Sequence, residues 1–422
     1  MDIFFPHHLL TFIEKSHPLV QIGLLLLFGY LGGRIANYFK FPKVSGYIVI
    51  GVVLSPSVSG LFHEELVNED LAIITDIALG IIAFSIGGSL ELKNLKRLYG
   101  SILWINFTQA FAVFFLVTAL VSLVSPLFIG PGNSPDSFWQ SYFPMALVIG
   151  AVSAATAPAA ILAIVHEYRA KGPLTTTLLG VVALDDATAI VFFTLATSVA
   201  QTLITLEAVS WHHIIVTPLL HISLSLLLGI ISGIILIKTA RFLKRPEAML
   251  GVLIGFIFLT SGMAISFEVS PLIANMVFGF MVVNYVEHSL DLFRVVESIE
   301  ELIFSMFFTL AGAHINVQAL ASGGLLACLI VFSRFTGKLL GVRIGGYISH
   351  APQVVKRYLG LALLPKAGVT VGLILLAKDI FGASPLSVIM VNAVLASVVI
   401  NELIAPPLTR YALYKAEETN QE

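Results

Sequence analysis

Hydrophobic residues fill most of this chain in long runs that only short polar stretches interrupt. About 20 apolar residues span the hydrocarbon core of a bilayer as a helix, and most of the runs reach that length. The pattern predicts about thirteen spanning helices. We place them at residues 18–38, 44–62, 71–90, 99–128, 141–165, 172–203, 212–240, 247–265, 270–286, 299–313, 319–348, 355–378 and 384–410. The sequence therefore predicts an all-α polytopic membrane protein.

Composition narrows the class of protein. Hydrophobic residues make up 57% of the 422 residues and charged residues only 11%, whereas a soluble domain carries roughly 25% charged residues. The net charge of -2 offers no basic surface for nucleic acid. The single cysteine, Cys328, excludes a disulfide within the chain. Because no nucleotide motif, zinc-ligand spacing or nucleophile elbow is present, the sequence favours neither an enzyme nor a bound cofactor.

Basic residues recur in alternate loops between the predicted helices. These loops carry Lys40 and Lys43; Lys93, Lys96 and Arg97; Arg169 and Lys171; Lys238, Arg241, Lys244 and Arg245; Arg294; Lys356 and Arg357; Arg410 and Lys415. The intervening loops hold little beyond Lys15 and Lys378. Cytoplasmic loops are enriched in Lys and Arg. The alternation therefore predicts a multi-pass protein of the inner (plasma) membrane, with its N-terminus outside and its C-terminus in the cytoplasm.

Five charged residues fall deep inside apolar segments instead of in loops. They are Asp185, Asp186, Arg334, Lys338 and Lys366. A charge at the centre of a bilayer costs between about 3 and 17 kcal/mol, depending on how it is estimated. Such residues persist when they pair with one another or line a polar cavity. One alternative is an Asp–Lys pair that only holds helices together, but such a pair needs a single carboxylate and this chain has two adjacent ones.

Adjacent carboxylates suit a site that binds either a cation or a proton. A dehydrated Na+ needs several oxygen ligands, at least one of them anionic, and the same carboxylate can bind a proton instead. Burial and like-charge repulsion both favour the protonated form of a carboxyl group, and two coupled carboxyls titrate as a unit. Asp185 and Asp186 therefore predict a site where cation and proton compete.

Two predicted helices carry a proline near their centre. Pro158 follows Thr156 and Ala157 in one, and the run from Pro365 to Gly368 lies in the other. Proline removes a backbone donor, and freed carbonyls at membrane depth occur only where they line a cavity. The triplet 99–128, 141–165 and 172–203 and the triplet 319–348, 355–378 and 384–410 are offset by seven predicted helices, which predicts an inverted repeat. Paired broken helices in such repeats indicate a transporter's substrate site, although either proline alone is also compatible with a plain kink.

The chain resembles the cation/proton antiporter superfamily over nearly its whole length. The resemblance rests on seven segments in the family's order: FPKVSGYIVIGVVLSP, IIAFSIGGSLELKNLKR, ATAPAAILAI, GVVALDDATAIVFF, VSPLIANMVFGFMVVN, FFTLAGAHINV and GKLLGV. It implies two crossing broken helices, with Asp186 as the main cation ligand and proton carrier. It also implies that Asp185 pairs with Lys338, and that Thr156 and nearby carbonyls complete the coordination.

The chain departs from the family pattern at both broken helices. Residues 156–158 read T-A-P where members often have T-D-P, and residues 365–368 read P-K-A-G where they often have P-R-G-E. The second departure leaves Lys366 as another candidate partner for an aspartate. Arg334 lies four residues before Lys338, hence on the same helical face, and two stacked cations need acidic neighbours. The candidates are Glu300, Glu301 and Glu402.

The resemblance implies an antiporter that exchanges Na+ or Li+ for H+. Residues 1–422 would form a single membrane domain, with 18–90 and 212–286 as scaffold and dimer part and 99–203 and 299–410 as ion-transport core. Proton binding to Asp185 would release Lys338, so that about two protons cross against one cation and net charge moves. A homodimer is implied by resemblance alone. The alternatives are a K+/H+ antiporter, a Na+-coupled solute symporter, and a non-transporting sensor or channel subunit.

Overall fold

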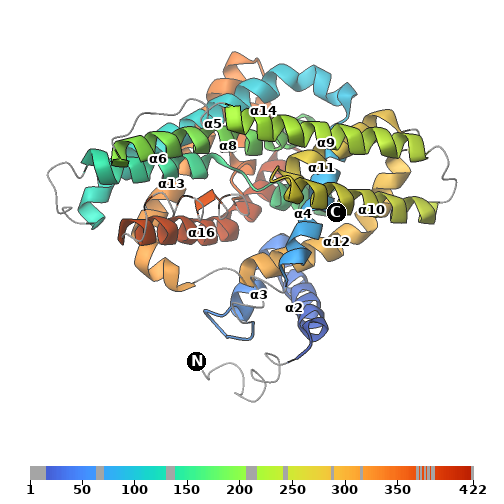
Figure 1. Cartoon of the computed structure of the whole chain (residues 1–422), viewed down its shortest axis with the longest axis horizontal. Coiled ribbons are helices and arrows are strands. Elements are labelled where there is room, and N and C mark those ends of the chain that lie inside the picture. The colour runs from blue at the N-terminus through green and yellow to red at the C-terminus, as the bar shows by residue number, and fades with distance from the viewer. Residues whose placement is uncertain are drawn as a thin grey trace. The chain divides into compact units, whose positions relative to one another are not determined.

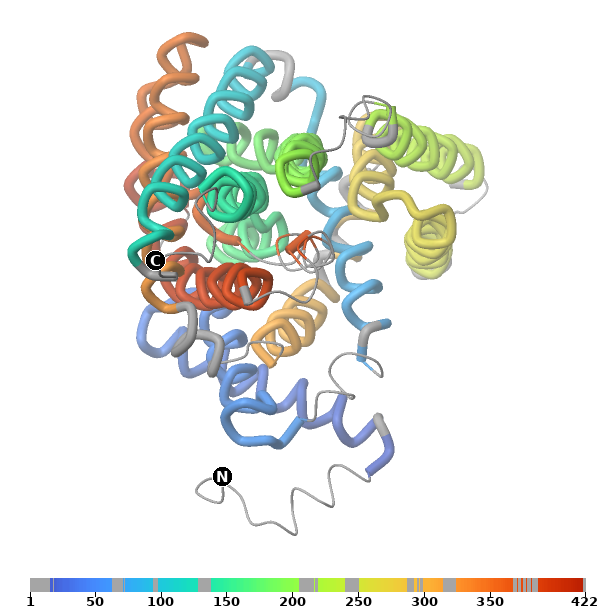
Figure 2. Tube along the Cα trace, turned by 60° about the vertical axis from the view of Figure 1, so that its left-hand side comes forward, coloured from blue at the N-terminus to red at the C-terminus, as the bar shows by residue number. Residues whose placement is uncertain are grey.

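The described part of the chain is helical and contains no strand (Figures 1 and 2). The structure is a computed structural model that describes residues 16–62, 71–129, 138–205, 216–240, 246–286, 289–313, 317–366, 370, 373–374, 377, 381 and 385–419. The all-α prediction is confirmed for these residues.

The helices group into two compact units. Unit 1 comprises Met1–Arg97, Pro158–Arg169 and His221–Asn316, and unit 2 comprises Leu98–Ala157, Ala170–Leu220 and Val317–Glu422. All of the predicted ion and charge-partner residues belong to unit 2. The functional names scaffold and ion-transport core stay predictions.

Unit 1 is built on close helix crossings. Its helices are α2 (Pro18–Tyr38), α3 (Lys43–Leu54), α4 (Ala72–Gly88), α7 (Pro158–Glu167), most of α9 (Thr217–Ala240), α10 (Pro246–Ser266), α11 (Pro271–Tyr285) and α12 (Ser289–Ala313). Helix α3 packs against α2 and α12, and α4 packs against α11. Helix α11 begins where its sequence predicts, because the Ser270 hydroxyl accepts from the Ile273 N–H at 3.3 Å and Pro271 occupies the first turn.

Unit 2 holds the longest helices. They are α5 (Leu92–Ile129), which begins in unit 1, α8 (Pro173–Thr205), α13 (Val317–Ile348) and α16 (Pro385–Lys415). Shorter elements are a π-helical turn, η2 (Phe138–Tyr142), and helices α6 (Phe143–Ala154) and α14 (Gln353–Ala362). Helix α13 packs against α16 and α14, and α6 packs against α8. Apolar side chains of α5, α6, α13 and α16 form one core, which includes Val113, Met145, Ile330 and Val394.

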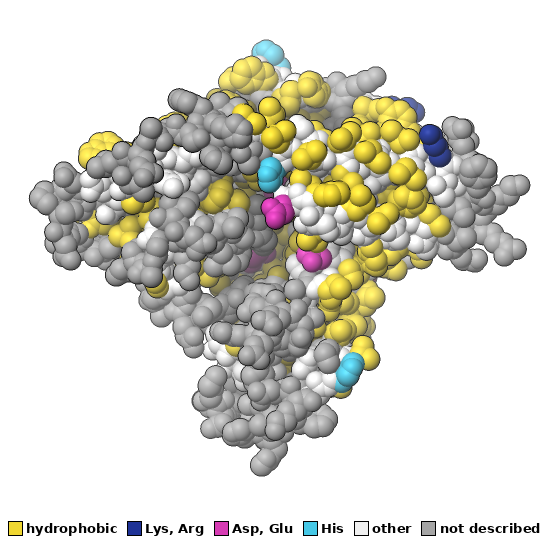
Figure 3. All heavy atoms as spheres, viewed as in Figure 1, with side chains coloured by type: hydrophobic (Ala, Val, Ile, Leu, Met, Phe, Trp, Pro, Cys, Tyr) yellow, Lys and Arg dark blue, Asp and Glu magenta, His cyan; other side chains and the backbone are white. Residues whose placement is uncertain are grey.

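Seven stretches of the described residues are long and apolar enough to cross a membrane, from Leu19–Tyr38 to Leu386–Lys415. Four shorter apolar helices accompany them: Lys43–Leu54, Ile73–Gly88, Leu250–Ser266 and Pro271–Tyr285. Where side chains are coloured in Figure 3, hydrophobic ones predominate on the surface and charged ones are few. Large apolar side chains such as Leu227 on α9 and Phe332 on α13 are exposed, as expected of helices in contact with lipid. The chain is a multi-pass helical membrane protein.

Glycine allows α13 to approach α5 closely. A Cβ atom added at Gly341 would lie 2.3 Å from the Gln109 Cα and 2.7 Å from the Thr108 carbonyl oxygen. The Thr108 hydroxyl donates to the Gly341 carbonyl oxygen at 2.8 Å. Small residues let helix backbones come together in membranes. Gly341 therefore sets the position of Gln109, a side chain of the site described below.

Gly341→Ala is expected to destabilise the fold, because the added methyl group overlaps backbone atoms of α5 and cannot be relieved by a side-chain rotation. Overpacking of this kind costs about 1–3 kcal/mol. Gly324→Ala on the same helix is the matched control, since nothing lies within 4 Å of a Cβ atom there. Thermal unfolding of the purified protein in detergent is the measurement. Equal melting temperatures for the two variants would contradict the close approach.

Candidate functional site

Two helices of the predicted repeat are broken. Helix α6 ends at Ala154, and Ala155 already has an extended backbone with φ -56° and ψ 145°. Helix α14 ends at Ala362, and residues 363–366 are not helical. The breaks lie side by side, because the Ala157 N–H donates to the Pro365 carbonyl oxygen at 2.9 Å. Pro158 begins α7, where its missing N–H disrupts no helical bond. Gly368 lies outside the described residues.

Basic side chains of α13 donate hydrogen bonds to the backbone carbonyl groups that have no helical partner at the first break. Arg334 donates through Nε to the Ser153 carbonyl oxygen at 2.9 Å and through Nη2 to that of Ala155 at 2.9 Å. Lys338 donates through Nζ to the Ala154 carbonyl oxygen between them, also at 2.9 Å. The last carbonyls of a helix have no partner within the helix and carry the negative end of its dipole. Buried cations are therefore well matched to this position.

The backbone carbonyl groups of the second break also accept hydrogen bonds from side chains. Arg334 Nη1 donates to the Leu364 carbonyl oxygen at 2.5 Å, and Nη2 lies 3.4 Å from the carbonyl oxygens of Leu363 and Pro365. From α16, Asn401 Nδ2 also donates to the Leu364 carbonyl oxygen at 2.5 Å. Arg334 is 1% exposed, and each of its hydrogen bonds among the described residues goes to a backbone carbonyl. A guanidinium group has five N–H donors and can serve both breaks at once.

The acidic neighbours expected for Arg334 lie elsewhere or make other contacts. In unit 1, Glu300 lies 2.5 Å from His166 Nδ1, and Glu301 pairs with Lys43. These residues line a unit 1 cavity of about 380 Å³ that contains none of the predicted site residues. Glu402 lies in unit 2 but accepts from the backbone of Lys366. Sequence spacing did not reveal that carbonyl groups surround the guanidinium.

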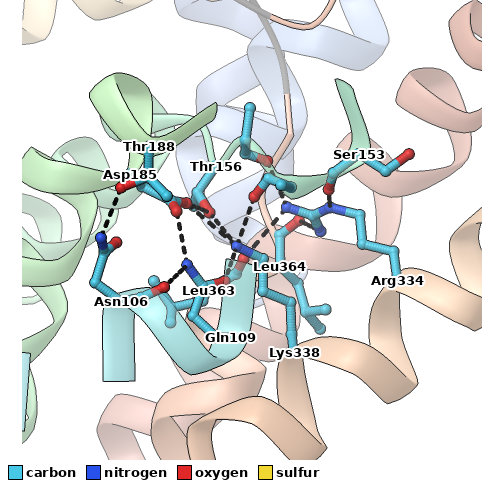
Figure 4. A network of polar contacts seen from close by, with 12 residues as sticks. Asn106, Gln109, Ser153, Thr156, Asp185, Thr188, Arg334, Lys338, Leu363 and Leu364 are labelled. Carbon is cyan, nitrogen blue, oxygen red and sulfur yellow. Dashed lines mark hydrogen bonds and ion pairs between the residues drawn. The ribbon is translucent and has the colours of Figure 1, made fainter. Parts of the chain in front are cut away.

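Asp185 on α8 has donors on both carboxylate oxygens and is completely buried. Gln109 Nε2 donates to Oδ1 at 2.6 Å. The Thr156 hydroxyl donates to Oδ2, and Lys338 Nζ lies 3.2 Å from the same oxygen. Figure 4 shows the four side chains converging from α5, α8, α13 and the first break. Lys338 also donates to the Gln109 side-chain oxygen and, at 2.7 Å, to the Thr156 hydroxyl. The structure thus joins Asp185 to Lys338, the lysine that the resemblance implies.

Asp186 differs from its neighbour. Its side chain is 4% exposed, and its buried Oδ1 has no hydrogen-bond partner among the described residues. Successive residues of a helix point about 100° apart, so Asp186 does not share the donors of Asp185. One turn of α5 before Gln109, Asn106 donates to Thr188 at 2.8 Å, while its buried Oδ1 also lacks a partner. The open oxygens of Asp186 and Asn106 can accept a cation or a proton donor.

Lys366 is the other candidate partner for Asp185, but its hydrogen bonds go to residues other than the aspartates. Its Nζ is 3.4 Å from the Ser153 hydroxyl and 3.3 Å from the Ser397 hydroxyl, and the residue is 1% exposed. Its backbone N–H donates to Glu402 Oε1 at 3.2 Å. These contacts place the Lys366 ammonium between α6 and α16, and no ion pair among the described residues includes it.

The predicted site omitted Gln109 and Asn106. Both are amides in an apolar segment that we assigned wholly to spanning helix, and their spacing of three residues puts them on one face. That spacing was the available signal. Among the described residues, no three His, Cys, Asp or Glu side chains are grouped as metal ligands would be.

The model of the sodium/hydrogen exchanger transmembrane family matches residues 23–411. The chain belongs to this family. The resemblance to the cation/proton antiporter superfamily is confirmed, and a family of transporters agrees with the prediction that the chain is not an enzyme.

Similar proteins extend the comparison. A Na+/H+ antiporter of Schizosaccharomyces pombe, itself uncharacterised, is 29% identical over 174 residues, which are 41% of this chain and 29% of that protein. The Na+/H+ antiporter NhaS4 of Synechocystis is 29% identical over 198 residues, which are 44% of this chain and 45% of that protein. The match thus spans less than half the length of these relatives.

Solved structures share the fold of this exchanger-family chain. The sodium proton antiporter MjNhaP1 of Methanocaldococcus jannaschii at pH 8 has a TM-score of 0.66 and 17% identity, covering 94% of this chain and 98% of that chain. A second structure of MjNhaP1, from electron microscopy, has a TM-score of 0.72 and 18% identity, covering 94% and 95%. The similarity supports the polytopic helical fold.

Arg334→Gln is expected to destabilise unit 2, because carbonyls of both breaks lose their donor. Each buried carbonyl left without a donor costs about 1–3 kcal/mol. Arg343→Gln, an exposed position on the same helix, is the control and is expected to change the free energy of unfolding by less than about 0.5 kcal/mol. Thermal unfolding in detergent separates the two. An Arg334 variant that melts with the wild type would refute the capping role.

Lys338→Gln and Asp185→Asn are expected to be coupled energetically. Each leaves its partner as an uncompensated buried charge, whereas the double variant removes both charges. The double variant should therefore be more stable than the sum of the single effects predicts, by about 0.5–3 kcal/mol. A double-mutant cycle of unfolding free energies measures this difference. Simple additivity would mean that the ion pair contributes nothing to the fold.

Proposed function

We propose that this protein is a secondary antiporter that exchanges Na+ or Li+ for H+ at the Asp185–Asp186 pair. One observation carries the proposal. Asp185 has donors on both oxygens, while the adjacent Asp186 keeps a buried oxygen without a partner among the described residues. A buried polar oxygen is unfavourable unless it gains a partner. A proton or a cation each supplies one.

Asp186 is the group for which the two substrates compete. As a carboxylate it offers a Na+ ion an anionic ligand, and as a carboxylic acid it carries a proton. Asp185, paired with Lys338 at 3.2 Å, lies next to this site as part of its framework. The Asn106 oxygen and the backbone of the first break are oxygen ligands of the kind that the cation also needs. The pair with Lys338 thus positions the site, and Asp186 performs the exchange.

The names of the relatives support this activity. Both curated relatives are Na+/H+ antiporters and MjNhaP1 is a sodium proton antiporter. Because the match spans less than half of the curated relatives, the activity of this chain remains our proposal. The preference for Na+ over K+ is the part that an assay must decide, since the first break reads T-A-P and offers no carboxylate of its own.

We also propose that exchange is electrogenic, with more protons than cations moved per cycle. Moving one net charge is worth about 2.3 kcal/mol per 100 mV, so a negative-inside potential would drive Na+ out of the cell. The protein would then act in the inner membrane as a homodimer, with its N-terminus outside. The dimer is proposed through residues 18–90 and 212–286.

Asp186→Asn is expected to abolish exchange while leaving the fold intact, because the amide keeps the shape of the side chain but neither ionises nor carries a proton. The measurement is cation-driven proton movement in proteoliposomes with a pH-sensitive dye, comparing Na+, Li+ and K+. Asp76→Asn, an exposed aspartate of α4, is the control and should transport normally. Robust exchange in the Asp186 variant would sink the assignment. Exchange driven by K+ alone would make the protein a K+/H+ antiporter, and wild type that moves no protons with any cation would favour a symporter or sensor.

A further inference from the structure

A second buried carboxyl oxygen in unit 2 lacks a donor. Glu402, on α16, is 3% exposed. Its Oε1 accepts from the Lys366 backbone N–H at 3.2 Å, and its Oε2 has no partner among the described residues. Asp186 Oδ1 is the other carboxyl oxygen of the described residues in this condition. Glu402 and Asp186 are thus both buried carboxyl groups with one oxygen that has no hydrogen-bond partner among the described residues.

Two basic residues lie at the second break beside Glu402, but neither bonds to Glu402 through its charged group. Arg334, on α13, directs its guanidinium to carbonyl oxygens of both breaks. Lys366, in the second break, directs its ammonium to the hydroxyls of Ser153 and Ser397 at 3.4 and 3.3 Å. A carboxylate at Glu402 gains from the positive charge of Arg334, whereas a carboxylic acid removes the penalty of a buried, unpaired anion.

Asp185 and Glu402 differ in their hydrogen-bond donors. Both oxygens of Asp185 already accept hydrogen bonds, from Gln109 on one side and from Thr156 and Lys338 on the other. Glu402 has one oxygen without a partner among the described residues, so a proton there displaces no hydrogen bond. The sequence-based expectation that Asp185 carries the second proton thus has a competitor in Glu402.

A continuous set of contacts joins Glu402 to the cation site. Glu402 accepts from the Lys366 N–H, and the preceding residue, Pro365, accepts from the Ala157 N–H. Ala157 follows Thr156, whose hydroxyl donates to Asp185. Arg334 adds a second route, because it binds carbonyls of both breaks and lies one turn from Lys338. These contacts link the surroundings of Glu402 to those of Asp185.

We propose that Glu402 is a second proton-binding group of the exchanger, which takes up a proton when the cation leaves the Asp185–Asp186 site and releases it when the cation binds. The step is a proton transfer alone: the acid form loses H+ to water and leaves a carboxylate that accepts from the Lys366 backbone N–H. The inference rests on the proposed exchange function and names the carrier of the second proton. Asp186 carries the first.

Infrared difference spectroscopy tests the protonation directly, without any transport. Spectra of the purified protein with and without Na+, or with K+ if the proteoliposome assay selects it, report carboxylic acid C=O stretches that disappear when the cation binds. The wild type should lose two such bands. Isotopic labelling of all glutamate carboxyls should shift one band and labelling of aspartates the other, which requires no variant. Glu402→Gln should remove the glutamate band, and Glu300→Gln, at a buried glutamate of unit 1, should leave it.

Charge movement tests the consequence for transport. In proteoliposomes clamped at different potentials, wild-type exchange should respond to the potential, because more protons than cations move. Glu402→Gln should lose about one proton per cation and become insensitive to the potential, while Glu300→Gln keeps the wild-type response. Thermal unfolding checks that the Glu402 variant is folded. If it is not, the labelling experiment on the wild type decides alone.

The outcomes separate this inference from the proposed function. A cation-sensitive aspartate band that Asp186→Asn abolishes, without any glutamate band, would overturn the role of Glu402 and leave the proposed function standing. The absence of any cation-sensitive carboxyl band would overturn both. Undiminished potential dependence in folded Glu402→Gln protein would likewise refute the second proton site.

Discussion

The site depends on one constraint: backbone carbonyls freed at two helix breaks must find donors away from water. Each unsatisfied carbonyl in a membrane interior costs several kcal/mol. Arg334 and Lys338, one turn apart on α13, supply those donors for residues 153–155, and Arg334 also serves the second break. Two of the donors at these breaks are therefore buried cations, and a buried cation is stabilised by a paired anion. Asp185 provides that anion at 3.2 Å from Lys338.

These requirements explain why carboxyl groups of the same chemical type have different hydrogen-bond partners. The donors around Asp185 come from α5, α13 and the first break, so that aspartate is part of the framework. Asp186 follows it directly in the chain but does not share those donors, and its buried Oδ1 has no partner among the described residues. Glu402 is held by a single backbone N–H at the edge of the same framework. Residue type alone does not distinguish these carboxyl groups. Their proposed roles follow from which of their oxygens already accept hydrogen bonds.

The sequence predicted the helical membrane fold, the buried charges and the prolines at which the helices break, because hydropathy and proline act locally along the chain. It could not predict the partners of Arg334. Backbone carbonyls have no sequence signature, and acidic side chains were the only counter-charges that a sequence displays. Gln109 was missed for a related reason, since its contacts to Asp185 and Lys338 are 76 and 229 residues away. The glycine that brings α5 within reach, Gly341, gains meaning only once the helix crossing is known.

Thr156 connects the Asp185–Lys338 ion pair to the first helix break. Its hydroxyl accepts from Lys338 and donates to Asp185, so its one proton and its lone pairs link the ion pair. The next residue ties the first break to the second through the Ala157 N–H and the Pro365 carbonyl oxygen. A change of charge at Asp185 alters the bond that Thr156 can make, and the backbone around Thr156 is held by Arg334, Lys338 and Pro365 in place of helical hydrogen bonds. In the exchange that we propose, the broken helix would provide oxygens near the cation and would also be the point where a change of charge becomes a change of backbone position.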